Sequence, residues 1–120
     1  MSYSVLIKDD HVYVKYSGIV EGLDIVQITA DETFINNMRR LQKVIHDFSF
    51  CDDVLMGIED MKEIALMSNL ESNFSEKLKA VIIPKDADGY ARVTALSQAI
   101  RSPDWQIYFA QNYAEALTKF

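Results

Sequence analysis

The chain has 120 residues, of which 49% are hydrophobic and 25% are charged, and its formal net charge is −6. This length and composition are typical of one globular domain, so we expect residues 1–120 to form a single domain. The acidic balance argues against a nucleic-acid surface, which requires a basic patch.

The single cysteine, Cys51, excludes an intramolecular disulfide and a four-cysteine zinc site. No run of the sequence reaches the ~18 apolar residues of a membrane span, and the first ten residues lack the apolar core of a signal peptide. We therefore expect a cytoplasmic protein without a membrane span.

Two short β-rich runs open the chain. Tyr3–Lys8 and His11–Ser17 flank Asp9 and Asp10, and the second run alternates with the period of two of a half-buried strand. An acidic two-residue turn between them predicts an antiparallel hairpin. We expect Gly18–Gly22 to connect this hairpin to the next element.

The spacing of apolar residues then changes to that of a helix. Over Leu23–Met38, apolar side chains recur every three or four residues, which predicts one amphipathic helix. Leu41–Phe48 is the next predicted strand, and the apolar, β-prone run Val44–Phe48 indicates an interior position in a sheet.

The remaining elements alternate between helix and strand. We expect helices over Val54–Phe74 and Asp88–Arg101, strands over Lys79–Pro84 and Trp105–Ala110, and a last helix after Asn112, where Glu115 completes a capping-box pattern. Ala80–Ile83 is apolar on both faces, which fits an interior parallel strand. The order ββαβαβαβα predicts an α/β fold with a mixed, mostly parallel sheet that begins with the hairpin.

With that order in place, the segment D-F-S-F-C-D-D-V-L-M, Asp47–Met56, resembles the segment before the second helix of STAS domains of the anti-anti-sigma type. That family carries D-L-S-x-x-D-S-S-G there, and Asp47, Ser49 and Asp52 fall on matching positions. The chain also resembles the SpoIIAA-like branch, which groups STAS domains with Sec14-type lipid-binding folds. This second likeness rests on Tyr16-Ser17-Gly18 before the acidic helix start at Asp24, and on Phe109 before an alanine-containing helix.

The resemblance implies a SpoIIAA-like β/α superhelix with a regulatory, protein-binding role and neither catalysis nor a cofactor. The family's phosphorylated serine falls on Val54, the serine before it on Asp53, and the glycine on Leu55. The implied module therefore resembles anti-sigma-factor antagonists but lacks their phosphorylatable serine.

Partner contact is expected at the end of the strand that contains Val44–Phe48, where ligands bind in open α/β sheets. The residues concerned are Phe50, Cys51, Asp52, Asp53 and Val54. Asp52 and Asp53 could form a metal or general-acid pair, but capping of the helix predicted from Val54 fits better, since Asp accepts hydrogen bonds from free helix N–H groups. The carboxylates beside Cys51 disfavour a thiolate, which predicts a buried filler and not a nucleophile.

The two histidines carry no clear catalytic signal. His46 lies in a predicted strand without an evident serine or cysteine partner, so we expect a packed, hydrogen-bonded core residue. His11 lies beside the hairpin turn, and we expect it to be solvated.

Two further hypotheses remain open from the sequence. The protein could carry a lipid or another small apolar molecule in a cavity lined by Phe34, Met61, Met67 and Tyr90. It could also form a weak homodimer through an open sheet surface covered by aromatic side chains, namely Tyr3, Tyr13, Tyr16 and Tyr108.

Overall fold

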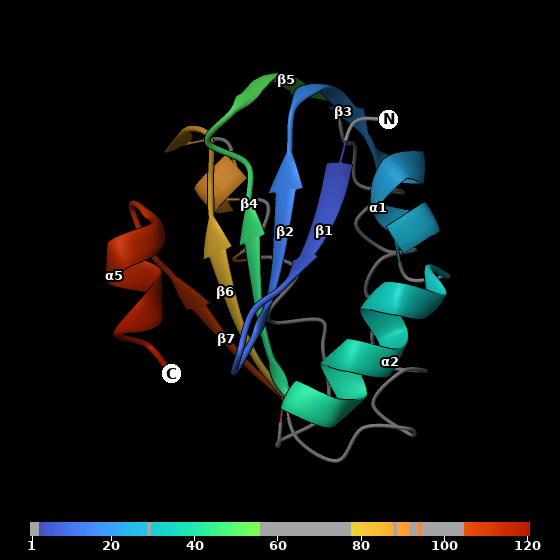
Figure 1. Cartoon of the computed structure of the whole chain (residues 1–120). Coiled ribbons are helices and arrows are strands. Elements are labelled where there is room, and N and C mark those ends of the chain that lie inside the picture. The colour runs from blue at the N-terminus through green and yellow to red at the C-terminus, as the bar shows by residue number, and fades with distance from the viewer. Residues whose placement is uncertain (1–2, 29, 56–77, 88, 92–93, 95–104) are drawn as a thin grey trace.

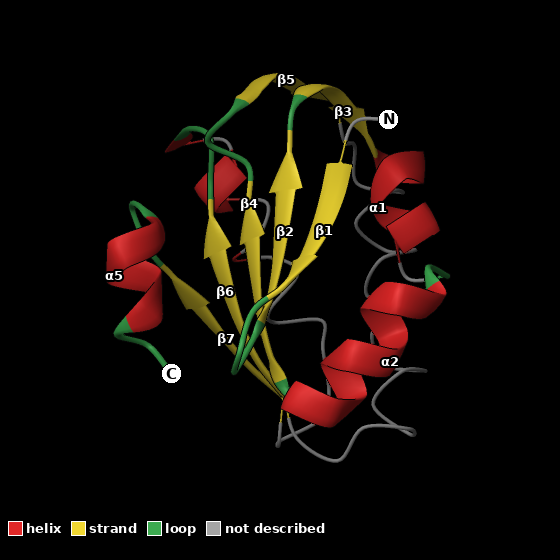
Figure 2. Ribbon diagram, viewed as in Figure 1, coloured by secondary structure: helices red, strands yellow, loops and turns green. Residues whose placement is uncertain are grey.

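The structure is a computed structural model that describes residues 3–28, 30–55, 78–87, 89–91, 94 and 105–120. A five-stranded sheet in the order β1-β2-β4-β6-β7 runs through the molecule (Figures 1 and 2). Its strands are β1 (Tyr3–Ile7), β2 (Val12–Tyr16), β4 (Lys43–Asp47), β6 (Leu78–Ile83) and β7 (Trp105–Phe109). β1 and β2 form an antiparallel hairpin and the other neighbours are parallel, so the predicted mixed, mostly parallel sheet is confirmed.

β4 and β6 occupy the interior of the sheet because their side chains are apolar on both faces. Val44 and Ile45 of β4 are fully buried, and so are Val81 and Ile83 of β6. The interior positions predicted for these two strands are therefore confirmed.

Helices pack on both faces of the sheet. On one face, Phe34 and Met38 of α2 (Glu32–Leu41) and Ile25 and Ile28 of α1 (Gly22–Ile28) pack into a cluster with side chains of β2 and β4. On the other face, Ala116 of α5 (Tyr113–Leu117) packs into a second cluster with side chains of β2, β4 and β6. Figure 1 shows α5 across the sheet from α1 and α2.

These helices overturn the expectation that Tyr13 and Tyr16 cover an open sheet surface. Tyr16 is fully buried and stacks on Phe48 with a centroid distance of 4.2 Å. Tyr13 is also buried, because Tyr113 of α5 packs edge-on against its ring at 5.0 Å. Neither ring is available to a second copy of the chain.

A second, two-stranded sheet pairs β3 (Gly18–Glu21) in parallel with β5 (Cys51–Leu55). The prediction that Gly18–Gly22 is only a connection is therefore wrong. Gly18 has a φ of 68°, a conformation that glycine adopts without strain, and the chain enters β3 there. Val20 can then bury its side chain in the core.

The start predicted for the second helix is wrong as well, because Val54 and Leu55 belong to β5. Val54 packs into the same cluster as Val20, its partner in the register, so burial of this β-branched pair favours a strand. The rest of that predicted helix lies outside the described residues.

The single helix predicted over Leu23–Met38 is two helices. Asp31 ends the connection between them and caps α2, since its carboxylate accepts a hydrogen bond from the backbone N–H of Phe34 at 3.1 Å. This cap stabilises the N-terminus of α2 and so separates it from α1. The apolar spacing continues across both helices, which is why periodicity alone predicts a single helix. α2 ends at Gln42, which adopts a left-handed φ of 59°.

The end of the chain follows its prediction closely. Asn112 caps α5 by accepting a hydrogen bond from the N–H of Glu115, and the Glu115 carboxylate accepts one from the N–H of Gln111. Of the helix predicted over Asp88–Arg101, residues 89–91 and 94 are helical and the others lie outside the described residues. Within the part of the chain that is described, no helix is both long and apolar enough to cross a membrane.

Candidate functional site

Asp47 fixes the turn that leads from β4 to β5. Its carboxylate is 3% exposed and accepts three hydrogen bonds: one at Oδ2 from the Tyr13 hydroxyl (2.6 Å), and two at Oδ1 from the backbone N–H and hydroxyl of Ser49 (2.9 and 2.6 Å). Burial, together with this carboxylate, raises the pKa of Tyr13, which keeps its hydroxyl protonated as a donor. The turn is thereby tied to the interior of the sheet.

Phe50 projects from this turn into solvent. Its side chain is 56% exposed, and the Lys15 ammonium lies 4.3 Å from the centroid of its ring. Among the described residues, Lys15 thus contacts the Phe50 ring through a cation–π interaction. The ring therefore keeps most of its surface free for a partner.

The outward side of the second sheet mixes apolar and acidic side chains. In the register, Ile19 lies opposite Asp53, and Glu21 lies opposite Leu55. Ile19 and Leu55 are 58% and 51% exposed, although both are large apolar residues. We call the outward side chains Ile19, Glu21, Asp53 and Leu55 the β3–β5 face.

The expectation that Asp52 and Asp53 cap a helix is wrong. Both lie in β5, and both are exposed. The register shifts from Gly18 opposite Cys51 to Ile19 opposite Asp53, so Asp52 is an extra residue with no partner on β3. The two carboxylates therefore place negative charge beside the apolar side chains of the face.

No group of side chains in the described ranges is suited to hold a metal ion. Cys51 is 7% exposed and packs into the core, so the predicted buried filler is confirmed. Burial, and to a lesser degree the charge of Asp47, raises the pKa of its thiol to about 11. The thiol stays protonated at neutral pH, which is the opposite of what a nucleophile needs.

His46 is packed and hydrogen-bonded, as predicted, but it is partly and not fully buried. The Tyr16 hydroxyl lies 2.9 Å from its Nδ1, and Phe34 packs against its ring. Burial lowers the pKa of His46 to about 4, so the ring is neutral at neutral pH.

The expectation that His11 is solvated is wrong, since this residue is 4% exposed. Its Nδ1 lies 2.7 Å from a carboxylate oxygen of Asp10, and its Nε2 lies 2.7 Å from the hydroxyl of Tyr113. Tyr113 follows 102 residues later, so no local pattern around the turn could reveal this contact. The one available signal was the place of Tyr113 among the apolar residues of the last helix.

The residues proposed to line an apolar cavity occupy different environments. Phe34 is 3% exposed inside the core, whereas Tyr90 is 52% exposed and packs against Phe109 at a centroid distance of 4.2 Å. Met61 and Met67 lie outside the described residues. The apolar carrier therefore stays a prediction.

Two solved structures resemble this chain along nearly all of its length. An uncharacterised protein of the DUF3478 family with a SpoIIAA-like fold, from Shewanella loihica PV-4, superposes with a TM-score of 0.56 over 98% of this chain and 90% of its own, at 15% identity. The anti-sigma factor antagonist SpoIIAA in its unphosphorylated form superposes with a TM-score of 0.58 over 98% of this chain and 94% of its own, at 10% identity. No family model and no curated protein matches the sequence.

The chain therefore has a SpoIIAA-like fold, the fold of STAS domains. At these identities the similarity establishes the fold alone, and the role of the molecule must be argued from its own surface.

Proposed function

We propose that the protein is a non-catalytic regulatory module that binds a protein partner, in the cytoplasm, through the β3–β5 face and the adjoining turn at Phe50. The observation that carries this proposal is the exposure of large apolar side chains at one end of the molecule. Ile19, Leu55 and Phe50 are each more than half exposed, and so is Leu23, which follows β3 at the start of α1.

Exposed apolar side chains that gather in one region commonly mark an interface. The acidic side chains of Glu21, Asp52 and Asp53 accompany them, and a mixture of apolar and polar side chains is usual for non-obligate protein interfaces. Among the partner-binding residues expected from the sequence, Phe50, Asp52 and Asp53 are exposed and suited to direct contact. The side chains of Cys51 and Val54 face the core and pack β5 against it.

Regulation by phosphorylation is not expected at this surface. The position of the family's phosphorylated serine is occupied by Val54, which is 8% exposed. A serine there would be buried, and a phosphate would add nearly two charges beside Asp52 and Asp53. We therefore expect that phosphorylation does not change the charge of the proposed module at this site.

Site-specific photo-crosslinking in the native cell tests the proposal. A photoreactive phenylalanine analogue at position 50 or at position 55 should give a discrete cross-linked product with one partner protein. The same analogue at Leu6, which is 45% exposed on β1, is the matched control. Once the partner is purified, Asp52→Ala and Asp53→Ala together should weaken its binding.

The outcomes separate the three hypotheses. A product of twice the mass of the chain identifies the homodimer, and native mass spectrometry that finds a bound apolar molecule instead supports the carrier. Absence of a partner at positions 50 and 55, or equal capture from Leu6, contradicts the proposed surface.

A further inference from the structure

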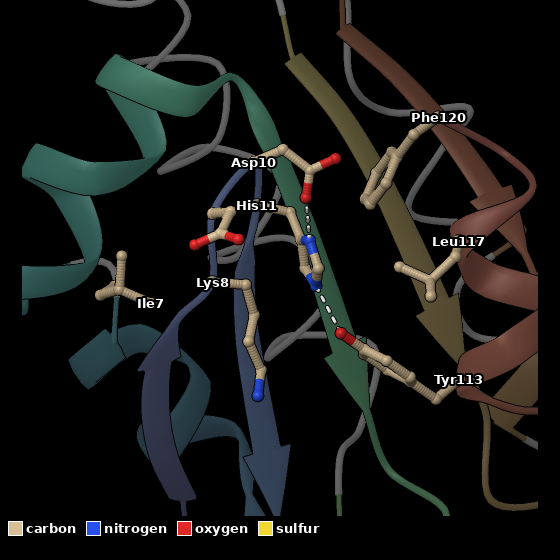
Figure 3. Close-up of a pocket in the computed structure, with 8 residues that line it drawn as sticks. Ile7, Lys8, Asp10, His11, Tyr113, Leu117 and Phe120 are labelled. Carbon is tan, nitrogen blue, oxygen red and sulfur yellow. Dashed lines mark hydrogen bonds and ion pairs between the residues drawn. The ribbon is translucent and has the colours of Figure 1, made fainter.

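A pocket of about 510 Å³ lies at the turn of the β1–β2 hairpin. Figure 1 shows this turn at the opposite end of the sheet from β3 and β5. One part of its wall is apolar and is formed by Ile7, Leu117 and Phe120. The polar part includes Asp10, His11 and Tyr113, which Figure 3 shows joined in one hydrogen-bonded chain. Residues from both ends of the sequence therefore build a single concave site.

The hydrogen bonds determine which polar groups face the pocket. The bond from His11 and the nearby charges of His11 and Lys43 lower the pKa of Asp10, so its carboxylate is ionised and only accepts. Nδ1 of His11 therefore donates to this carboxylate, and Nε2 lies 2.7 Å from the Tyr113 hydroxyl. The Tyr113 oxygen and the carboxylates of Asp9 and Asp10 supply hydrogen-bond acceptors to the wall, which also includes the Lys8 side chain.

Among the described residues, the two carboxylate oxygens of Asp10 meet different side chains. Oδ1 binds His11, whereas Oδ2 has the Lys43 ammonium at 4.0 Å, beyond hydrogen-bonding distance. The same ammonium lies 5.6 Å from the ring centroid of Phe120. The Lys43 ammonium thus lies near both the carboxylate and the ring, but too far from Oδ2 to donate a hydrogen bond to it.

The site is open to solvent, since the Asp10 side chain is 63% exposed. Asp9 adds a second exposed carboxylate to the lining. The Lys8 side chain runs away from Asp10 in Figure 3, so its ammonium does not lie over Oδ2.

We propose that this pocket binds a primary ammonium group carried on an apolar chain or ring. The ammonium donates to Oδ2 of Asp10 and lies near the face of Phe120, while the apolar part packs against Leu117. The Asp10–His11–Tyr113 chain positions the carboxylate. A free amine and the lysine side chain of another protein share this chemistry.

Titration of the full-length protein with phenethylamine, followed by two-dimensional NMR, tests the proposal. Saturable shifts should appear at Asp10, His11 and Leu117. The anion 3-phenylpropionate and the neutral 2-phenylethanol are matched ligands that should bind at least about tenfold more weakly, since they cannot form the charge-assisted hydrogen bond. A parallel titration with Nα-acetyl-lysine methylamide tests a lysine side chain as the source.

Three variants locate the site. Asp10→Asn should weaken phenethylamine binding at least about tenfold. Lys43→Met removes the competing internal cation and should strengthen binding several-fold. Glu21→Gln makes the same change of charge at the far end of the sheet and should leave the affinity unchanged, and the amide spectrum of each variant reports that it is folded.

The proposal is overturned if 3-phenylpropionate binds as tightly as phenethylamine, if no residue of the pocket shifts, or if Asp10→Asn and Glu21→Gln have equal effects. Tighter binding of the lysine derivative than of phenethylamine identifies a protein side chain as the natural source. The reverse order identifies a free amine.

Discussion

Two polar pairs between β2 and β4 show how single residues are arranged around this sheet. Tyr13 bonds Asp47 on one face and Tyr16 bonds His46 on the other, because successive side chains of a strand point to opposite faces. In the register, His46 lies opposite Val14 and Asp47 lies opposite Lys15, so both bonds are diagonal. The buried Asp47 and the partly buried His46 thereby each have a partner, which avoids the cost of leaving these groups unsatisfied.

The sequence predicted one of the two histidine environments. His46 could be recognised as a core residue because it lies within an apolar strand, which is local information. His11 lies beside an acidic turn and becomes buried only when α5, from the other end of the chain, packs over it. Contacts between residues so far apart in sequence leave no periodic pattern to read.

His46 should make the stability of the protein depend on pH. The folded protein keeps the ring neutral down to its pKa of about 4, whereas the unfolded chain takes up the proton near the ordinary value of 6.5. Proton uptake by the unfolded state therefore lowers the free energy of unfolding as the pH falls from about 6.5 to about 4, by up to ~3 kcal/mol.

Urea unfolding at several pH values in this window measures the effect. His46→Gln retains an acceptor for the Tyr16 hydroxyl but cannot titrate, so its free energy of unfolding should change less with pH. The carboxylates titrate in both proteins and cancel in the comparison. Parallel pH profiles for the two proteins would contradict this role of His46.

At the scale of elements, the interior strands and the last helix were predicted correctly, whereas the breaks between elements at Asp31 and Asp53 were not. The interior strands follow from their apolar composition, and the last helix follows from Asn112 and Glu115. Asp31 and Asp53 are chemically alike in the sequence, yet only Asp31 caps a helix. Val54, which follows Asp53, is buried in a strand beside Val20. The periodicity of the sequence around Val54 does not indicate this pairing, because Val20 is distant in sequence.

Replacing an aspartate that caps a helix and replacing an aspartate exposed on a strand should have different effects on stability. Asp31→Ala removes the hydrogen bond to the N–H of Phe34 and should lower the free energy of unfolding by about 1 kcal/mol. Asp52→Ala, the matched control, alters an exposed strand residue and should change it by less than about 0.5 kcal/mol. Chemical unfolding followed by circular dichroism measures both, and a larger loss in Asp52→Ala would mean that β5 is misassigned.

At the scale of the whole molecule, one sheet supports two hydrophobic clusters. β2 contributes Val12, Val14 and Tyr16 to one cluster and Tyr13 to the other, and β4 and β6 are divided in the same way. Neither cluster can lose its strands without exposing the other. The sequence predicted this sheet but left one of its surfaces open, whereas α5 packs on that surface in the structure.

We therefore expect the domain to unfold in a single cooperative transition. Val14→Ala removes methyl groups from the cluster beneath α1 and α2, and Ile45→Val removes one from the cluster beneath α5. Each should lower the free energy of unfolding, by roughly 0.5–1.5 kcal/mol for Ile45→Val and more for Val14→Ala. Far-ultraviolet and near-ultraviolet circular dichroism should give the same urea midpoint within each variant. If Ile45→Val shifted only one of the two signals, α5 and its cluster would unfold as a separate unit, and the pocket beside Tyr113 would open without loss of the β3–β5 face.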